Sequence, residues 1–311
     1  MAKGKTKRYN DLGLGTKEDR GGYRAINKDG SFNVKKVNVP LLEQLNFFHS
    51  LITMPWPKFL GFILLWYFSI NIIFASTYTL IGVEHLTGIK PSTTLDGFIE
   101  AFFFSAQTIT TLGYGRVAPM GNLANTVAAI ESMLGLLGFA LATGLLYGRF
   151  SRPSTMIQYS RSAVIAPYQN SNGFMFRVVN PQNNHLLELE VQLNLAIKRE
   201  DSDLRDFYAL ELERDKVAFM PYMWTIVHPI SDSSPLFGLD ERQFLEKEVE
   251  FIVSMKAFDE TTSQNVYSRS SYKAPEIKWG AKFVYAIIRK KNSITIDVGK
   301  LDETETAALN S

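Results

Sequence analysis

The chain has 311 residues, of which 46% are hydrophobic, and its formal net charge is +2. This near balance of charge gives no reason to expect nucleic-acid binding, and the absence of cysteine excludes disulfides, thiolate metal sites and cysteine nucleophiles. The length allows two domains, and the mean hydropathy of −0.04 averages an apolar part that ends near Phe150 with a polar remainder. No apolar leader follows Met1, so we expect no signal peptide.

Residues 1–39 are basic and polar, and we expect them to form an extended cytoplasmic arm. From Pro40 to Met54, apolar residues recur at near-helical spacing with polar residues between them. This pattern predicts a short amphipathic helix that lies at the membrane surface. Pro55-Trp56-Pro57 should end that helix, and Lys58 is placed to contact lipid headgroups.

Two long apolar runs predict membrane-spanning helices. Residues 59–83 contain no charged residue, and a helix of that length extends over about 37 Å, enough to cross a hydrocarbon core of about 30 Å. Residues 123–148 form the second run, in which Glu131 is the one acid. A charge at the bilayer centre costs about 2.5–3.5 kcal/mol, so Glu131 should face protein or water. Basic residues before the first run and after the second place both chain ends in the cytoplasm.

The stretch between these runs carries the strongest motif. Residues 95–110 suit a re-entrant helix that is too short to cross, and Thr110-Thr111-Leu112-Gly113-Tyr114-Gly115 follows. Its last five residues resemble the T-V-G-Y-G loop of potassium-selective filters, whose backbone carbonyls replace the water around the ion. Gly113 and Gly115 permit a positive φ, Thr111 adds a hydroxyl oxygen and Tyr114 can brace the loop. One chain supplies one strand, so we expect a closed ring of four chains.

From residue 154 onward the hydrophobic period changes to two. Residues His185 to Ile197 alternate, with Leu187, Leu189, Val191, Leu193 and Leu195 on one face, and Val249 to Ala257 alternate as well. Residues 174–179, 207–212, 282–288 and 293–298 add short strand patterns. We predict a β-sandwich over residues 154–301 with a tail at 302–311. No hydrolase, metalloprotease or dinucleotide motif occurs, so we expect no enzyme activity; the four scattered histidines are interpreted as structural.

Further stretches support the filter motif: Met54–Pro57, Arg149–Pro153, Ser162–Ile165, Phe176–Asn180, Thr225–Ile230, Ser234–Leu236, Arg269–Tyr272 and Glu276–Gly280. Each is weak alone, and in this order they are specific. Together with the filter they resemble the inward-rectifier potassium channels, most closely their prokaryotic, KirBac-type branch, from about Val39 to Leu301. The resemblance implies a homotetramer in the cell membrane that conducts K⁺ without a cofactor, with cytoplasmic immunoglobulin-like domains that extend the ion path.

The resemblance also implies roles for single residues. Thr111, Leu112, Gly113, Tyr114 and Gly115 coordinate K⁺, supported by Gln107 and Thr110. Phe139 and Tyr147 narrow the pore in prokaryotic members. The remaining implied sets are the pore-lining Glu131, Gly135 and Thr143, the anionic-lipid ligands Lys58, Arg149 and Arg152, and the cytoplasmic constriction loop with Asp259, Glu260, Gln264 and Ser268.

The sequence departs from the family pattern at several points. Strong rectification in animal members needs an acid in the second span that holds Mg²⁺ or polyamine, and Phe139 stands there. Glu131 lies about two turns toward the outside, as a partial substitute or as support for the filter. Gln107 stands where many members have a glutamate, so we expect no buried ion pair behind the filter. Tyr147 can alternatively pack between helices.

Two alternative functions have to be compared with the sequence. A channel gated by voltage or by a nucleotide-binding domain would need an Arg-rich helix before Phe59 or a glycine fingerprint after the second span, and the sequence has neither. A membrane-anchored β-sandwich that binds a ligand and conducts nothing could be a monomer, but it leaves the filter motif unexplained.

Overall fold

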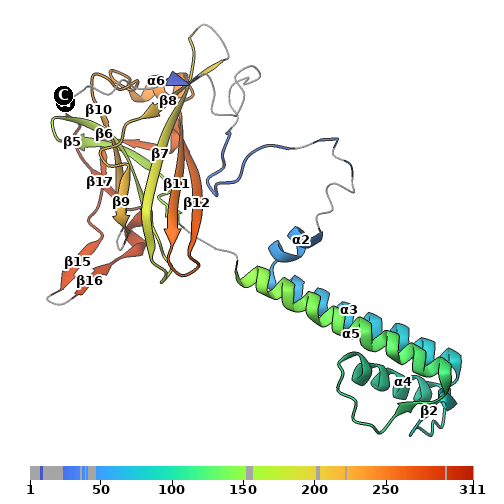
Figure 1. Cartoon of the computed structure of the whole chain (residues 1–311). Coiled ribbons are helices and arrows are strands. Elements are labelled where there is room, and N and C mark those ends of the chain that lie inside the picture. Colours follow the sequence, from blue (N-terminus) through green and yellow to red (C-terminus); the bar gives the residue numbers. More distant parts are fainter. Residues whose placement is uncertain are drawn as a thin grey trace. The chain divides into compact units, whose positions relative to one another are not determined.

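The computed structural model describes residues 8–9, 24–35, 37–38, 40, 47–151, 157–200, 204–220, 223–290 and 293–310. The chain divides into two compact units (Figure 1). One is helical and comprises Asn38–Arg152; the other is rich in strands and combines Met1–Val37 with Pro153–Ser311.

The α-helices described in the helical unit are α2 (Phe47–Thr53), α3 (Trp56–Ile81), α4 (Thr94–Ile109) and α5 (Gly121–Phe150). Pro57 occupies the first turn of α3, where a missing N–H is tolerated, and Gly82 ends the helix with a φ of +112°. The Thr93 side chain caps α4 by accepting from the Asp96 N–H at 3.1 Å. The described part of the predicted surface helix is α2, because residues 41–46 lie outside the described residues.

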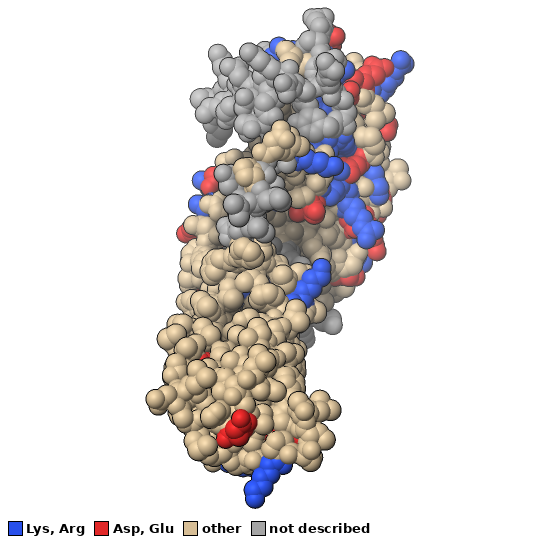
Figure 2. Space-filling model, turned by 90° about the vertical axis from the view of Figure 1, so that its right-hand side faces the viewer, with Lys and Arg blue, Asp and Glu red and all other residues tan. Residues whose placement is uncertain are grey.

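α3 and α5 are long and apolar enough to cross a membrane, and only 22% and 11% of their most apolar stretches are buried. α4 packs against both through a small core that includes Phe74, Tyr78, Ala101 and Phe104. A short pairing of β2 (Leu86–Thr87) with β3 (Ala118–Pro119), next to η1 (Val83–His85), joins the chain before and after α4. Figure 2 shows almost no charged side chain on the viewed face of this unit.

The second unit is a two-layer β-sandwich. One sheet has the order β1-β8-β7-β11-β12, with β9 also on β7; the other has the order β10-β6-β5-β13, with β4 on β6. Phe174 on β6 and Phe251 on β11 stack between the layers with ring centroids 3.7 Å apart. The elements are β1 (Arg8–Tyr9), β4 (Gln158–Tyr159), β5 (Ala163–Tyr168), β6 (Ser171–Val179), β7 (Leu186–Lys198), β8 (Arg205–Leu210), β9 (Lys216–Phe219), β10 (Trp224–Ile230), α6 (Glu241–Glu246), β11 (Glu250–Asp259), β12 (Gln264–Lys273), η2 (Ala274–Glu276), β13 (Ile277–Trp279), β14 (Ala281–Phe283), β15 (Ile287–Lys290), β16 (Ser293–Ile296), η3 (Val298–Leu301) and β17 (Thr304–Thr306).

Two details of the predicted strands are wrong. Leu186 is buried in place of Leu187, because Glu188 has a φ of +47° and the register between β7 and β11 shifts there. A bulge of this kind moves the residues before it to the other face of the strand. The strand predicted over residues 282–288 is divided between β14 and β15.

The residues predicted to form a tail belong to the sandwich unit. β17 pairs with β14, and the backbone N–H of Asn310 donates to the Asn172 side chain at 2.9 Å. The Asn310 side chain also donates to the backbone carbonyls of Ser171 and Gln169. A polar stretch without strand periodicity gave no signal for these long-range bonds.

His228 holds the turn that follows β10, with only 3% of the residue exposed. The Glu211 carbonyl can only accept, so Nδ1 of His228 donates to it over 2.6 Å. In the neutral ring, Nε2 then accepts from the Ser234 hydroxyl at 2.8 Å. Burial lowers the pKa of His228. The structural role that we predicted for this histidine therefore agrees with its contacts.

Acid should destabilise the sandwich unit through His228. A histidine whose pKa is lowered on folding binds fewer protons in the folded state, so the free energy of unfolding decreases as pH falls below about 6.5. The thermal midpoint of the full chain in detergent should fall more between about pH 7.5 and about pH 5 for the wild type than for His228→Gln. The exposed His185 is the matched control, and His185→Gln should retain the wild-type pH dependence. Equal losses in wild type and His228→Gln would contradict the prediction.

Candidate functional site

The filter loop, Thr111–Gly115, has an alternating backbone. Thr111, Gly113 and Gly115 have φ values of +58°, +49° and +80°, whereas Leu112 and Tyr114 have negative values. Alternation of left- and right-handed residues gathers successive N–H groups on one side of the chain, which leaves the carbonyl oxygens on the other. A positive φ in β-branched Thr111 is strained, and such strain concentrates at functional sites.

The end of α4 fixes the start of this loop. The Gln107 carbonyl accepts from the N–H groups of Leu112 and Gly113, at 2.8 and 3.3 Å, and the Thr108 carbonyl accepts from the Thr111 N–H at 3.0 Å. The Thr110 hydroxyl donates back to the Ala106 carbonyl at 2.6 Å. Gln107 therefore supports the loop through its backbone carbonyl.

In the single chain the filter loop is exposed, and among the described residues no other segment packs against its tip. Leu112 and Tyr114 are 54% and 75% exposed, and an added Cβ on Gly113 or Gly115 would meet open space. Tyr114 does not brace the loop within its own chain, contrary to our expectation, because its ring lies outward. An unpartnered strand of this kind needs other surfaces around it before it can surround an ion.

Behind the loop lies a buried polar cluster that we call the buttress, made of Asn71, Tyr78, Ser105 and Glu131. All four are at most 1% exposed. The Tyr78 hydroxyl donates to the Glu131 carboxyl at 2.7 Å, and the Ser105 hydroxyl bonds to its other oxygen. Ser105 Oγ also lies 2.9 Å from the Asn71 side-chain oxygen. Glu131 faces protein, as expected for an acid in a membrane span, and its burial favours the alternative in which it supports the filter.

Gly135 lies at a close contact between α5 and α4. It is buried, and a Cβ built on it would lie 2.1 Å from the Ile109 carbonyl oxygen. This close approach brings the last turn of α4 directly against α5. The missing side chain of Gly135 is thus a packing requirement of the loop's support.

Three other predicted residues share an open face of α5. Phe139, Thr143 and Tyr147 recur every fourth position and all are exposed, Phe139 to 75% and Tyr147 to 73%. The Thr143 hydroxyl bonds only to the Phe139 carbonyl of its own helix. This face is left free by α3 and α4, so the alternative in which Tyr147 packs between helices of the same chain does not hold.

The ion pair near the loop lies where we did not predict it. Arg116, which directly follows Gly115, pairs with Glu100, seven residues before Gln107 on α4. Both side chains are partly exposed. Arg116 therefore has an acidic partner on α4 of its own chain.

The residues predicted to bind anionic lipid differ in their surroundings. Lys58 is exposed, and Arg152 lies outside the described residues. Arg149 is engaged within the helical unit: its guanidinium donates to the carbonyls of Leu51, Ile52 and Met54. Arg149 thus has partners within its own chain, and its expected role as a lipid ligand stays a prediction.

The residues of the predicted constriction loop also differ in their surroundings. Asp259 is 3% exposed and accepts from the Thr261 N–H and the Asn184 side chain, and Ser268 accepts from the Tyr159 hydroxyl at 3.0 Å. These two residues connect the β11–β12 hairpin to other parts of the sandwich unit. Glu260 and Gln264 are exposed at its tip.

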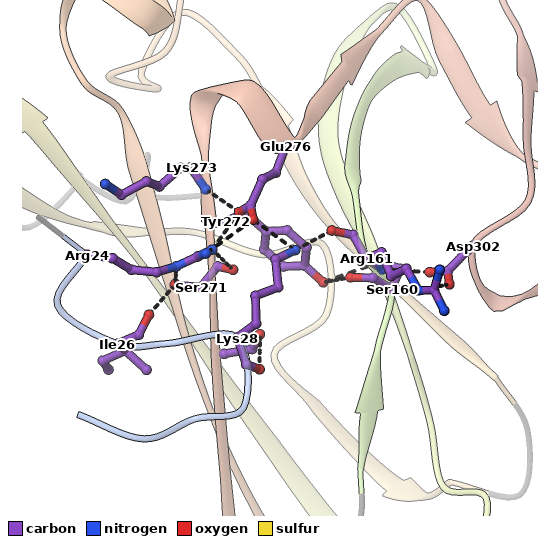
Figure 3. Close-up of polar contacts among 11 residues, drawn as sticks. Arg24, Ile26, Lys28, Ser160, Arg161, Ser271, Tyr272, Lys273, Glu276 and Asp302 are labelled. Carbon is purple, nitrogen blue, oxygen red and sulfur yellow. Dashed lines mark hydrogen bonds and ion pairs between the residues drawn. The ribbon is translucent and has the colours of Figure 1, made fainter. Parts of the chain in front are cut away.

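Sequence reasoning missed an ionic cluster in the sandwich unit, which we call the clasp: Arg24, Lys28 and Glu276 (Figure 3). Arg24 binds both carboxylate oxygens of Glu276, at 3.1 and 2.5 Å. The Lys28 ammonium lies 3.6 Å from Glu276 and 4.3 Å from the ring centre of Tyr272, and it donates to the Arg161 carbonyl. Two segments 252 residues apart meet here, and no local pattern signals such a contact.

The clasp fixes a turn formed by residues 24–33 on β12. Ser271 donates to the Ile26 carbonyl at 2.5 Å and Ser270 to the Lys28 carbonyl at 3.1 Å. Burial raises the pKa of the Glu276 carboxyl, but hydrogen bonds from Arg24 and the Lys273 backbone, with the charge of Lys28, outweigh it and leave the pKa below its ordinary value. Glu276 therefore stays ionised at neutral pH.

Among the described residues, no cluster of histidine, aspartate and glutamate could hold a metal ion. The chemistry available at the filter loop is that of backbone carbonyl oxygens, which suit the dehydration of a cation. No nucleophile and base face one another there, as hydrolytic chemistry would require.

Comparisons with known proteins cover nearly the whole chain. A family model described as "Inward rectifier potassium channel C-terminal domain" matches residues 157–311, and one described as "Ion channel" matches residues 61–152. The inward rectifier potassium channel Kirbac3.1 of Paramagnetospirillum magnetotacticum is 33% identical over 90% of this chain and 95% of its own length. The ATP-sensitive inward rectifier potassium channel 12 of Gallus gallus is 26% identical over 90% of this chain and 71% of its own length.

Ser105→Ala should destabilise the helical unit by about 1–3 kcal/mol, because it leaves buried groups of the buttress without a partner. Ser76→Ala is the matched control: Ser76 lies on α3 and bonds only to the Ile72 carbonyl of its own helix, so its loss should stay within about 0.5 kcal/mol. Denaturant unfolding in detergent measures both. Similar losses for the two variants would contradict the role of the buttress.

Glu276→Gln should release residues 24–33 from β12. Loss of the bidentate pair with Arg24 should cost about 1 kcal/mol or more and speed amide exchange in this turn roughly fivefold. Glu305→Gln is the control, because its pair with Lys282 is more than half exposed on both sides. Hydrogen exchange read by mass spectrometry tests this, and unchanged protection of residues 24–33 in Glu276→Gln would reject it.

Proposed function

Because the chain belongs to the inward rectifier potassium channel family, we propose that four copies form a ring in which their filter loops dehydrate and pass K⁺. The family consists of ion channels, so the protein is no enzyme. The single observation that supports this use of Thr111–Gly115 is the alternation of φ along the loop. It gives carbonyl oxygens a common direction, as the coordination of a bare cation requires.

The proposed ring of four accounts for two surfaces that are uncovered in a single copy. The filter loop and the Phe139–Tyr147 face of α5 are exposed together in a single copy. A closed cyclic assembly places identical loops around one axis and covers the remaining apolar surface with neighbouring copies or lipid. A membrane-anchored receptor that conducts nothing would have no use for this strained loop.

The gate in this proposal is the open face of α5. Phe139 and Tyr147 would face the axis and narrow the path, with Thr143 between them. Glu131, Gly135 and the Gln107 carbonyl would act from behind, by holding α4 and the start of the filter loop. Because Glu131 is buried, it offers no charge to Mg²⁺ or polyamines, so we expect weak rectification.

The proposal also includes the orientation of the chain in the membrane. α3 and α5 would span the cell membrane, with both chain ends and the sandwich unit in the cytoplasm. Lys58, near the start of α3, and Arg152 would contact anionic phospholipid, at about 1 kcal/mol for each basic residue near the surface. Glu260 and Gln264, at the exposed tip of the β11–β12 hairpin, would line the cytoplasmic ion path.

Gly113→Ala should abolish selective K⁺ flux in liposomes. Position 113 needs a φ of +49°, which alanine adopts only with strain, so the carbonyl alternation should break. Gly144→Ala is the matched control, since both glycines have open space at the Cβ position but Gly144 is helical. Gly144→Ala should keep the preference for K⁺ over Na⁺. Equal K⁺ and Na⁺ flux through the intact wild-type tetramer would overturn the proposed function.

A further inference from the structure

The inner end of α5 is attached to α2 by one side chain. Nη1 of Arg149 donates to the carbonyls of Leu51 and Ile52, at 2.6 and 3.1 Å, and Nη2 donates to the Met54 carbonyl at 2.7 Å. These carbonyls lie at the end of α2, where the last turn of a helix has no partners of its own. A cation at this position also complements the negative end of the helix dipole.

Aromatic rings enclose the same guanidinium. Its central carbon lies 4.5 Å from the ring centre of Trp56 and 4.3 Å from that of Phe59, both in the first turn of α3. Phe59 is fully buried. Such contacts strengthen when the cation is shielded from water. One arginine on α5 therefore joins the end of α2 to the start of α3.

The neighbouring residue brings the helices close enough for this attachment. A Cβ on Gly148 would lie 3.1 Å from Ile52 Cδ1, so α2 packs directly on the α5 backbone. Arg149 and Tyr147 are two positions apart and thus point about 200° apart around the helix. Arg149 accordingly faces α2 while Tyr147 lies on the open face.

We infer that Arg149 is a positioning residue that makes α2 and the inner end of α5 move as one body. The inference rests on the proposed function, in which Tyr147 narrows the ion path. Any motion that withdraws Tyr147 must then carry α2 with it or break the bonds of Arg149. Most of the stability of a helix in a protein comes from tertiary packing, and the bonds of Arg149 are such a contact at the end of α2.

The same contacts oppose a role for Arg149 as a lipid ligand. Both terminal nitrogens already donate to carbonyls, and Nε is buried. A bidentate contact of the guanidinium with a phosphate would therefore compete with its bonds to the end of α2. Lys58, which is exposed, is the basic residue of this region that remains open to a headgroup.

Flux measurements distinguish an Arg149 that attaches α2 to α5 from an Arg149 that binds lipid. Arg149→Gln, Arg149→Lys and Lys58→Gln are reconstituted in phosphatidylcholine vesicles with graded fractions of phosphatidylglycerol. Arg149→Gln should change K⁺ flux at least about fivefold, the lower end of typical coupling between sites, by the same factor at every lipid fraction. Arg149→Lys should not restore it, because a compact ammonium cannot reproduce the planar fork. Lys58→Gln should instead change how the K⁺ flux depends on the phosphatidylglycerol fraction.

A spectroscopic measurement tests the attachment without relying on flux. The chain has no cysteine, so Ser50→Cys carries a single nitroxide on the exposed side of α2. The label should become more mobile in both Arg149 variants and remain unchanged in Lys58→Gln. Size-exclusion elution confirms assembly, and Arg149→Lys keeps the test valid if Arg149→Gln does not assemble.

Three results would overturn the inference: wild-type flux in Arg149→Lys, an Arg149→Gln effect that varies with the phosphatidylglycerol fraction, or an unchanged label spectrum in both variants. A wild-type tetramer that passes no K⁺ would instead reject the proposed function, while the label spectrum would still decide whether Arg149 holds α2.

Discussion

The structure of the helical unit depends on holding one short backbone segment in an unfavourable conformation. Thr111 has a positive φ although it is β-branched, and strain of this kind costs on the order of 1–3 kcal/mol and persists only where the surroundings enforce it. Here the enforcement starts with the Gln107 carbonyl, which captures two successive N–H groups of the loop. The strain is local, but its support extends through three helices.

That support combines a polar and a steric element. The buttress joins α3, α4 and α5 through the buried carboxyl of Glu131, and Gly135 lets the α4 carbonyl at Ile109 approach α5 without a side chain between them. A buried polar group is stabilising only when its partners are complete. The loop is therefore supported by residues buried within the helical unit, among them Glu131 and Gly135.

Basic side chains perform a related task elsewhere in the chain. Arg149 holds the end of α2 by three carbonyl bonds, and Arg24 with Lys28 holds the turn of residues 24–33 on the sandwich through Glu276. In both places a basic side chain attaches a segment to a part of its unit that is distant in the sequence. The planar guanidinium suits this role because its donors reach several acceptors in fixed directions.

The sequence by itself determined the two apolar helices, the re-entrant helix, the filter loop and most strands, because these depend on local periodicity and on glycines at fixed spacing. The residues of the open α5 face came from the family resemblance, and their four-residue interval is consistent with one face of a helix. Tertiary structure decided the roles of Glu131, Gly135, Arg149 and Asp259, and it incorporated the residues after Leu301 into the sandwich. Whether a polar side chain lines a path or fastens a helix depends on which backbone carbonyls and side chains lie opposite, and those partners come from distant parts of the chain.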